Sequence, residues 1–156
     1  MTSIGWTIRP ARPGDAPALH RMREEAGWDQ EKVAAWIAAS IAGERPTWVA
    51  ELAGQAVGMV SLELADSDPE VADGDGVAAV TSLSVLASAG RRGIGRALTV
   101  FAEGQARARG VRVLTLNTRP TNAAAIALYE GLGYRRWKQE TRSWGLAVFL
   151  RKSLAE

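Results

Sequence analysis

The chain has 156 residues, of which 47% are hydrophobic and 23% are charged, and its formal net charge at pH 7 is +2. This length and composition fit one compact domain over residues 1–156 and exclude intrinsic disorder and low-complexity fibres. The sequence has no cysteine and one histidine, His20, which argues against thiolate chemistry and against a metal site. The nearly balanced charge and the lack of a long apolar run argue against nucleic-acid and membrane partners, so a soluble cytoplasmic protein is expected.

A short strand and two helices are expected at the start of the chain. Residues 6–9 form a β-like run that Pro10 closes, and Asp15 is placed to cap the helix that follows. Asp29 is placed to cap a second helix, whose apolar residues recur at helical spacing until Gly43.

Strands then alternate with two further helices. A period of two over residues 47–64 predicts a hairpin, and a second strand pattern covers residues 77–86. Helices are expected from residue 94 to a stop at Gly110 and from Thr121 or Asn122 to a stop at Gly131, with strands at 111–118 and, as two short runs, within 134–152. The order β-α-α-β-β-β-α-β-α-β-β predicts an α/β fold with a mixed sheet, in which the strands at 77–86 and 111–118 form a parallel pair.

The turn after the strand at 77–86 is rich in glycine and arginine, from Gly90 to Arg96. Glycines let an anion approach the backbone closely, and the start of the following helix adds N–H groups and a partial positive charge. The turn therefore predicts a pyrophosphate site, and the alternative is an ordinary tight connection with solvent-exposed arginines. Leu98 stands where a dinucleotide fingerprint needs glycine, and no Gly-Lys-Ser or Gly-Lys-Thr occurs, so a nucleotide-binding module is the weaker alternative.

Four blocks of sequence occur in a recognisable order: 83–85, 91–98, 114–116 and 122–134, of which the last reads N-x-x-A-x-x-L-Y-x-x-x-G-[FY] in full. In order and separation they resemble the GNAT superfamily of acetyl-CoA-dependent N-acetyltransferases. The resemblance covers most of the chain and implies the acyl-CoA N-acyltransferase fold, with acetyl-CoA as co-substrate and no metal. It implies that the cofactor is bound by Leu83, Ser84, Val85, Arg91, Arg92, Gly93, Ile94, Gly95, Arg96, Ala97 and Asn122.

Tyr129 matches the tyrosine that, in this superfamily, lies close to the thioester sulfur and protonates the leaving thiolate. A phenol suits that role because its ordinary pKa of about 10 keeps it protonated at pH 7. The alternative is a core aromatic that packs with Ile126 and Leu132 on one helix. Because the chain has no cysteine, direct attack of a primary amine on the thioester in a ternary complex is the expected mechanism.

The sequence departs from the superfamily pattern in three places. Gly90 stands where relatives usually have Arg or Gln, and Ala87 where they usually have Pro. No carboxylate occurs from residue 77 to residue 86, which excludes the glutamate base that many relatives carry on that strand. The base is expected to be Glu63, for which a solvated carboxylate is the alternative reading, or water relayed through Thr81, Ser82 or Ser84.

The acceptor is expected to be a small-molecule or peptide amine. Five acidic residues between Asp66 and Asp75, with Glu24 and Glu25, suggest a cationic acceptor such as an aminoglycoside or a polyamine, and a solvated polar loop is the alternative. Trp28 could line the acceptor cleft or lie in the core. The alternative functions are a non-catalytic acyl-CoA-binding or regulatory domain and a transferase for a longer acyl-CoA. The resemblance also implies a tendency to form homodimers.

Overall fold

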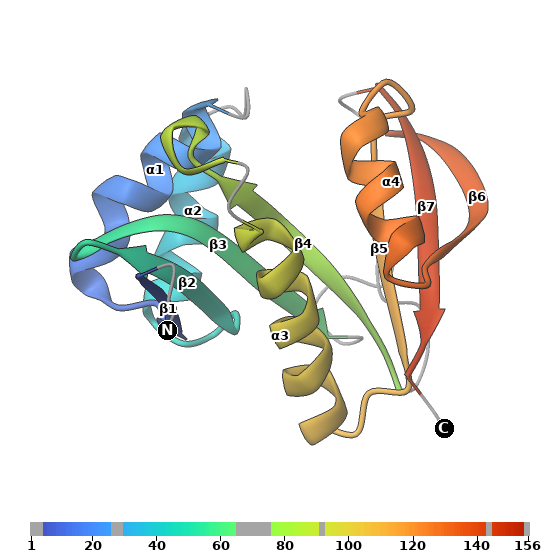
Figure 1. The fold of residues 1–156 in the computed structure, drawn as a ribbon, viewed down its shortest axis with the longest axis horizontal. Coiled ribbons are helices and arrows are strands. Elements are labelled where there is room, and N and C mark those ends of the chain that lie inside the picture. The colour runs from blue at the N-terminus through green and yellow to red at the C-terminus, as the bar shows by residue number, and fades with distance from the viewer. Residues whose placement is uncertain (1–4, 26–29, 65–75, 91–92, 143–144, 155–156) are drawn as a thin grey trace. The chain divides into compact units, whose positions relative to one another are not determined.

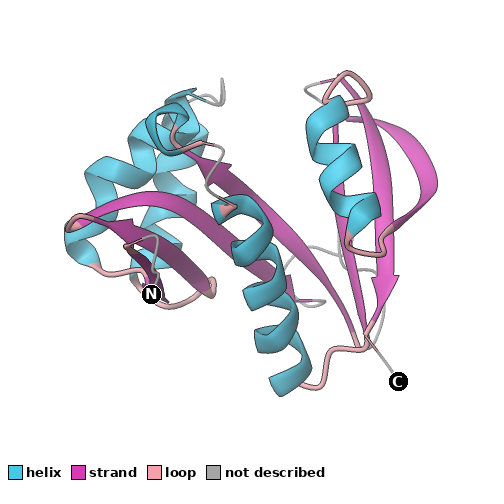
Figure 2. Ribbon diagram, viewed as in Figure 1, coloured by secondary structure: helices cyan, strands magenta, loops and turns pink. Residues whose placement is uncertain are grey.

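The computed structural model describes residues 5–25, 30–64, 76–90, 93–142 and 145–154. Over these residues the helices and strands follow the predicted order, and Figure 1 and Figure 2 show where each lies along the chain. The strands are hydrogen-bonded in the order β1-β2-β3-β4-β5-β7-β6, which confirms the expected mixed α/β fold. The elements are β1 (Trp6–Pro10), η1 (Pro13–Asp15), α1 (Ala16–Glu25), α2 (Gln30–Ile41), β2 (Thr47–Leu52), β3 (Gln55–Leu64), β4 (Val77–Val85), η2 (Ala87–Ala89), α3 (Ile94–Ala108), β5 (Val113–Thr118), α4 (Ala123–Gly131), β6 (Arg135–Arg142) and β7 (Gly145–Ser153).

The chain divides into two compact units, and each is described by itself. Unit 1 comprises residues 1–62 and 81–102, and unit 2 comprises residues 63–80 and 103–156. The boundary runs through β3, β4 and α3, so each of these elements contributes residues to both units.

In unit 1, β1 pairs with β2 and β2 pairs with β3, both antiparallel. Helical spacing of apolar residues gives α1 and α2 one buried face each, because residues three or four apart lie on the same side of a helix. The Trp48 ring in β2 and the Phe101 ring in α3 form a T-shaped pair with a centroid distance of 5.6 Å. The buried side chains of this core include Leu19, Met22, Val33, Ile37, Val49 and Met59.

Asp15 has a different role from the predicted one. It ends the short turn η1 instead of capping α1, and its carboxylate accepts a hydrogen bond of 2.8 Å from the Arg12 backbone N–H. The same carboxylate pairs with the Arg9 guanidinium at 2.8 Å. These hydrogen bonds and the Arg9 charge hold the pKa of Asp15 below its usual range against the opposing effect of burial. The prediction missed this arrangement because Arg9 reaches Asp15 from the preceding strand.

In unit 2, β4 pairs with β5 in parallel, which confirms the predicted parallel pair. β5 pairs with β7 and β7 pairs with β6, both antiparallel. Consecutive residues are buried in the middle of β5 and β7, so side chains on both faces of these strands are covered. The buried residues of this unit include Leu114, Leu116, Ile126, Tyr134, Phe149 and Leu150.

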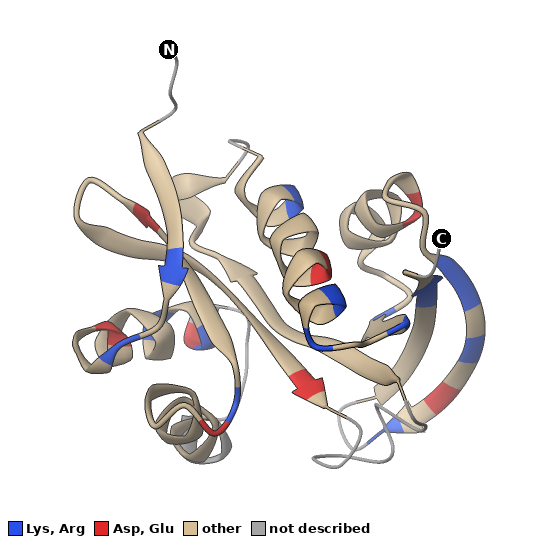
Figure 3. Cartoon of the chain, turned by 90° about the horizontal axis from the view of Figure 1, so that it is seen from below, with Lys and Arg blue, Asp and Glu red and all other residues tan. Residues whose placement is uncertain are grey.

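The strand β6 is charged and exposed along most of its length. It is the curved strand at the right of Figure 3, where its Lys and Arg residues are blue. The Lys138 ammonium and the Arg142 guanidinium lie 4.7 and 5.0 Å from the Phe149 ring. Charged side chains on an edge strand discourage pairing with another chain. Among the described residues, no helix is long and apolar enough to cross a membrane.

Candidate functional site

The last half of β4, in unit 1, carries three of the residues predicted to bind the cofactor. Leu83, Ser84 and Val85 are each half-buried. Just before them, Ser82 has a φ of 55°, which only glycine adopts readily. This residue interrupts the regular pleat of β4, and such backbone outliers cluster at functional sites.

The described part of the turn into α3 is Gly93 and the first residues of the helix. Gly93 has a φ of 78°, a conformation in which a side chain would be strained. Among the described residues of this turn, the first backbone hydrogen bond of the helix runs from the Ala97 N–H to the Gly93 carbonyl at 3.0 Å. The N–H groups of Ile94, Gly95 and Arg96 precede that bond and are the amides that a helix leaves available at its start. Arg91 and Arg92 lie outside the described residues.

Gly58 in β3 lets α3 approach this part of unit 1 closely, and the sequence reasoning did not single it out. A Cβ atom at Gly58 would lie 3.0 Å from Ile94 Cγ2 and 3.1 Å from Leu98 Cδ1. It would also lie 3.4 Å from the Ser84 carbonyl oxygen. The glycine therefore sets the spacing between β3, β4 and the first turn of α3.

Two buried arginines hydrogen-bond to side chains of β4, and these residues were also missed. Arg23, 5% exposed, donates from Nη1 to the Ser84 hydroxyl at 2.8 Å. Arg45, 8% exposed, donates from Nη2 to the hydroxyls of Thr81 at 2.6 Å and Ser82 at 2.8 Å. The hydroxyls of Thr81, Ser82 and Ser84, which the sequence suggests as a route for a water relay, each accept a hydrogen bond from a guanidinium group.

In unit 2, Tyr129 lies on α4 and is 7% exposed. Burial raises the pKa of its phenol to about 12, because ionisation would place a charge in a poorly solvated environment. Its ring forms a T-shaped pair with the Tyr134 ring at a centroid distance of 6.0 Å. Tyr129 is therefore both a packed aromatic and a phenol that keeps its proton at neutral pH, so the two readings of this residue are compatible.

Tyr134 also belongs to a buried cluster of polar and charged side chains. The Glu103 carboxylate accepts a hydrogen bond of 3.0 Å from the Tyr134 hydroxyl and pairs with the Lys152 ammonium at 3.0 Å. Burial and the Glu103 charge raise the pKa of Tyr134 well above its usual range. The cluster ties α3 to β7 and to the residue that ends the last motif.

Asn122, an exposed residue, caps α4 through its side chain. Its Oδ1 accepts from the Ala125 N–H at 3.2 Å, and its Nδ2 donates to the Thr118 hydroxyl at 3.3 Å. This capping role explains why an asparagine begins the last motif. A contact with the cofactor stays a prediction.

The residues predicted for the base and the acceptor are less clearly placed. Glu63 is half-buried near the end of β3 in unit 2, and Glu24 is exposed on α1 in unit 1. Trp28 and the acidic loop at 66–75 lie outside the described residues, as do details of the Glu25 side chain. No group of three or more His, Asp or Glu side chains in the described part of the chain could hold a metal ion.

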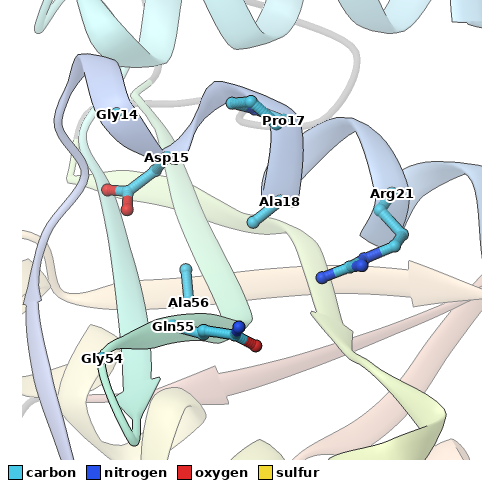
Figure 4. Close-up of a pocket in the computed structure, with 8 residues that line it drawn as sticks. All are labelled: Gly14, Asp15, Pro17, Ala18, Arg21, Gly54, Gln55 and Ala56. Atoms are coloured by element: carbon cyan, nitrogen blue, oxygen red, sulfur yellow. The ribbon is translucent and has the colours of Figure 1, made fainter.

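A hollow of about 310 Å³ in unit 1 lies between the start of α1 and the β2–β3 turn (Figure 4). Its lining includes Asp15, Ala18, Arg21, Gln55 and Ala56. None of the residues predicted to bind the cofactor or the acceptor lines it. The Asp15 carboxylate in its lining forms an ion pair with Arg9, so this hollow is not part of the candidate site.

Comparison with known proteins identifies relatives over most of the chain. A family model for the acetyltransferase (GNAT) family matches residues 15–134. The mycothiol acetyltransferase of Amycolatopsis mediterranei (strain U-32) is 30% identical over 147 residues, which cover 88% of this chain and 49% of that protein. The chain thus spans about half the length of that relative.

Solved structures share the fold. A ribosomal-protein-alanine N-acetyltransferase from Brucella melitensis matches with a TM-score of 0.76 and 26% identity, covering 94% of this chain and 99% of that chain. The protein yncA from Salmonella typhimurium, whose structure was solved with acetyl-CoA, matches with a TM-score of 0.76 and 22% identity, covering 97% of this chain and 95% of that chain. At that identity the second match supports the fold alone.

Proposed function

The chain belongs to the acetyltransferase (GNAT) family, and on that premise we propose that it is one N-acetyltransferase domain that transfers an acetyl group from acetyl-CoA to a primary amine. The observation that carries the proposal is the β4–α3 turn. There a glycine with a φ of 78° introduces a helix whose first amides are available to a pyrophosphate. A cytoplasmic location stays a prediction from the sequence.

The cofactor contacts follow from the motifs. The backbone of Leu83 and Val85 would bind the pantetheine arm in the manner of an added strand. The amides of Arg92, Gly93, Gly95 and Arg96 would bind the pyrophosphate, with the side chains of Arg91, Arg92 and Arg96 contributing positive charge. Asn122 would also hydrogen-bond to the cofactor, in addition to the hydrogen bonds with which it caps α4.

The proposed reaction is direct transfer, since the sequence has no cysteine to carry an acyl group. The neutral amine attacks the thioester carbonyl and forms a tetrahedral intermediate, which collapses with cleavage of the carbon–sulfur bond. Tyr129 gives its proton to the departing thiolate, and the amine loses a proton to a base. We assign the base to Glu63, with bound water as the alternative.

Burial suits Tyr129 to this step. A phenol with a pKa of about 12 is fully protonated at neutral pH, so it is available as an acid in every turnover. A developing thiolate in a poorly solvated site is stabilised by a proton donor more strongly than it would be in water.

The test is a thiol-release assay with acetyl-CoA and a panel of small-molecule and peptide amines. Tyr129→Phe is expected to lower kcat by about 100-fold or more, the range for loss of a general acid, and to leave acetyl-CoA affinity unchanged. Tyr134→Phe is the matched control, because it removes the other phenol oxygen of the ring pair without touching Tyr129.

Other outcomes would contradict parts of the proposal. Acetyl-CoA binding without turnover for any amine, with Tyr129→Phe silent, would indicate a non-catalytic acyl-CoA-binding or regulatory domain. Faster turnover with longer acyl-CoAs than with acetyl-CoA would show that the acyl donor is a longer acyl-CoA. An equal loss of kcat in Tyr129→Phe and Tyr134→Phe would remove the special role of Tyr129. Sedimentation velocity would decide whether the enzyme is a homodimer.

A further inference from the structure

The backbone of β4 is irregular at Ser82, immediately before the residues proposed to bind the pantetheine arm. Its φ of 55° lies in the left-handed region, which is unfavourable for a residue with a Cβ atom and readily adopted by glycine. Such a conformation persists where the surrounding structure holds it in place. The pairing of β4 with β5 runs from Val77 to Ala79, so Ser82 lies beyond that ladder.

The Arg45 guanidinium binds the strand at this irregularity. In a regular strand the side chains of consecutive residues point to opposite faces. Here one nitrogen atom of Arg45, Nη2, donates to the hydroxyls of both Thr81, at 2.6 Å, and Ser82, at 2.8 Å. The left-handed backbone at Ser82 accounts for the position of both hydroxyls on one side of β4. A regular pleat would carry the Ser82 hydroxyl to the opposite face and break its hydrogen bond.

Arg45 is itself held in the core of unit 1, which suits it to anchor another segment. The residue is 8% exposed. Its backbone N–H donates to the Ala39 carbonyl at 3.3 Å, and its own carbonyl accepts from the Thr47 hydroxyl at 2.9 Å. Its guanidinium lies 5.5 Å from the Trp36 ring centroid. Because these contacts already restrict the side chain, binding to β4 costs it little further conformational entropy.

The conformation of Ser82 affects the direction of the backbone that follows it. The peptide group that joins Ser82 to Leu83 is planar, so it turns as one unit when the backbone angles of Ser82 change. The N–H and C=O groups of a strand point to its two edges, and a ligand that adds as a strand binds those at one edge. A regular conformation at Ser82 would therefore change the edge that the backbone groups of Leu83 and Val85 present.

We propose that Arg45 is a positioning residue for acetyl-CoA binding. It holds Ser82 in the left-handed conformation and thereby directs the backbone groups of Leu83 and Val85 towards the pantetheine arm. Arg45 acts through Ser82 and contributes no group of its own to the ligand. This inference rests on the proposed function, because it concerns the same cofactor site.

The competing explanation is that Arg45 only stabilises the core, and two substitutions of Ser82 separate the explanations. Ser82→Gly removes the hydroxyl and adopts a φ of 55° without strain, so it makes the anchor unnecessary. Ser82→Ala removes the same hydroxyl and keeps the strain. A role in positioning predicts that acetyl-CoA binds more tightly to Ser82→Gly than to Ser82→Ala. A role in core stability alone predicts that the two folded variants bind it equally.

The experiment measures the affinity of the folded proteins for acetyl-CoA by calorimetry. Arg45→Gln should weaken binding by about tenfold or more, the scale of a hydrogen bond from a charged group. Ser82→Ala should weaken it by about fivefold or more, the scale of strain in the left-handed region. The double variant Arg45→Gln/Ser82→Gly should bind as tightly as Ser82→Gly alone, so the two positions are coupled in a double-mutant cycle.

Two control variants and a control ligand accompany these measurements. Arg23→Gln removes another buried guanidinium, which donates to the Ser84 hydroxyl at 2.8 Å, and its effect should be the same with and without Ser82→Gly. Arg109→Gln changes an exposed arginine just after α3 and should leave the affinity unchanged. The ligand 3′-phospho-ADP carries the pyrophosphate of CoA and lacks the pantetheine arm, so Arg45→Gln should not weaken its binding.

The outcomes separate failure of this inference from failure of the proposed function. The inference alone is overturned if Arg45→Gln binds acetyl-CoA as tightly as wild type, or loses the same affinity with and without Ser82→Gly. An equal loss of affinity for 3′-phospho-ADP would also overturn it. If the folded wild-type protein does not bind acetyl-CoA, the proposed function fails and the inference fails with it. If Arg45→Gln does not fold, equal affinities of Ser82→Ala and Ser82→Gly would refute the positioning role.

Discussion

Replacing Tyr134 with phenylalanine removes one hydroxyl from the buried cluster that ties α3 to β7. The ring keeps its volume and its edge contact with Tyr129, and Glu103 keeps the Lys152 ammonium at 3.0 Å. The change therefore isolates the 3.0 Å hydrogen bond from the phenol to the carboxylate. A hydrogen bond to a charged partner contributes about 1.5–3 kcal/mol, and since the carboxylate keeps its ion pair, we expect the free energy of unfolding to fall by about 2 kcal/mol.

Urea unfolding followed by tryptophan fluorescence measures this loss, with the slope against urea expected to stay constant. Glu103→Gln should lower the free energy of unfolding further, because it removes the charge that both Tyr134 and Lys152 contact. At a temperature where the variant is folded, kcat of Tyr134→Phe should remain within about twofold of wild type, on the ordinary scale of a change that leaves the reacting groups in place. A loss of less than about 0.5 kcal/mol, the level of an ordinary surface substitution, would refute the view that this hydrogen bond stabilises unit 2.

Three further predictions concern stability and the cofactor turn. Gly58→Ala should lower the free energy of unfolding by about 1–3 kcal/mol through overpacking against Ile94, and it should weaken acetyl-CoA binding. The control Gly104→Ala, at an open helical position, should raise the free energy of unfolding by up to about 1 kcal/mol. Urea unfolding that shows Gly58→Ala to be stabilising would contradict this prediction. Gly93→Ala should weaken calorimetric acetyl-CoA binding, since a side chain at a φ of 78° is strained by about 1–2 kcal/mol, and unchanged affinity would count against the turn. The phenol of Tyr129, with its pKa raised from 10.0 to about 12, binds its proton more tightly in the folded state. Its contribution of up to about 3 kcal/mol is therefore complete below pH 10 and lost towards pH 12, so Tyr129→Phe should flatten the fall in stability over that window, and an unaltered profile would contradict the assigned burial.

The fold was predictable because local patterns determine most of it. Period-two runs, helix stops and the parallel βαβ order each depend on neighbouring residues, and the structure confirms the order of elements. The glycine-rich turn that contains Gly93 could be recognised for the same reason, because its residues are neighbours in the sequence.

Long-range contacts were not predictable in this way. Arg23 and Ser84 are 61 positions apart, and Arg45 and Thr81 are 36 apart, so no spacing in the sequence brings them together. Nothing in the sequence around Gly58 indicates that α3 packs against it, because the contacting residues Ile94 and Leu98 are far along the chain. Asp15 shows a smaller version of the same limit, because its partner Arg9 belongs to the preceding strand.

Calorimetric titration with acetyl-CoA and with CoA is the most direct test of the central claim that the β4–α3 turn belongs to an acetyl-CoA-dependent enzyme. We expect saturable binding of both ligands at one site per chain, weakened by Gly93→Ala and unaffected by Arg109→Gln. The claim would be contradicted if neither acetyl-CoA nor CoA binds to the folded wild-type protein, or if ATP or NAD binds in their place.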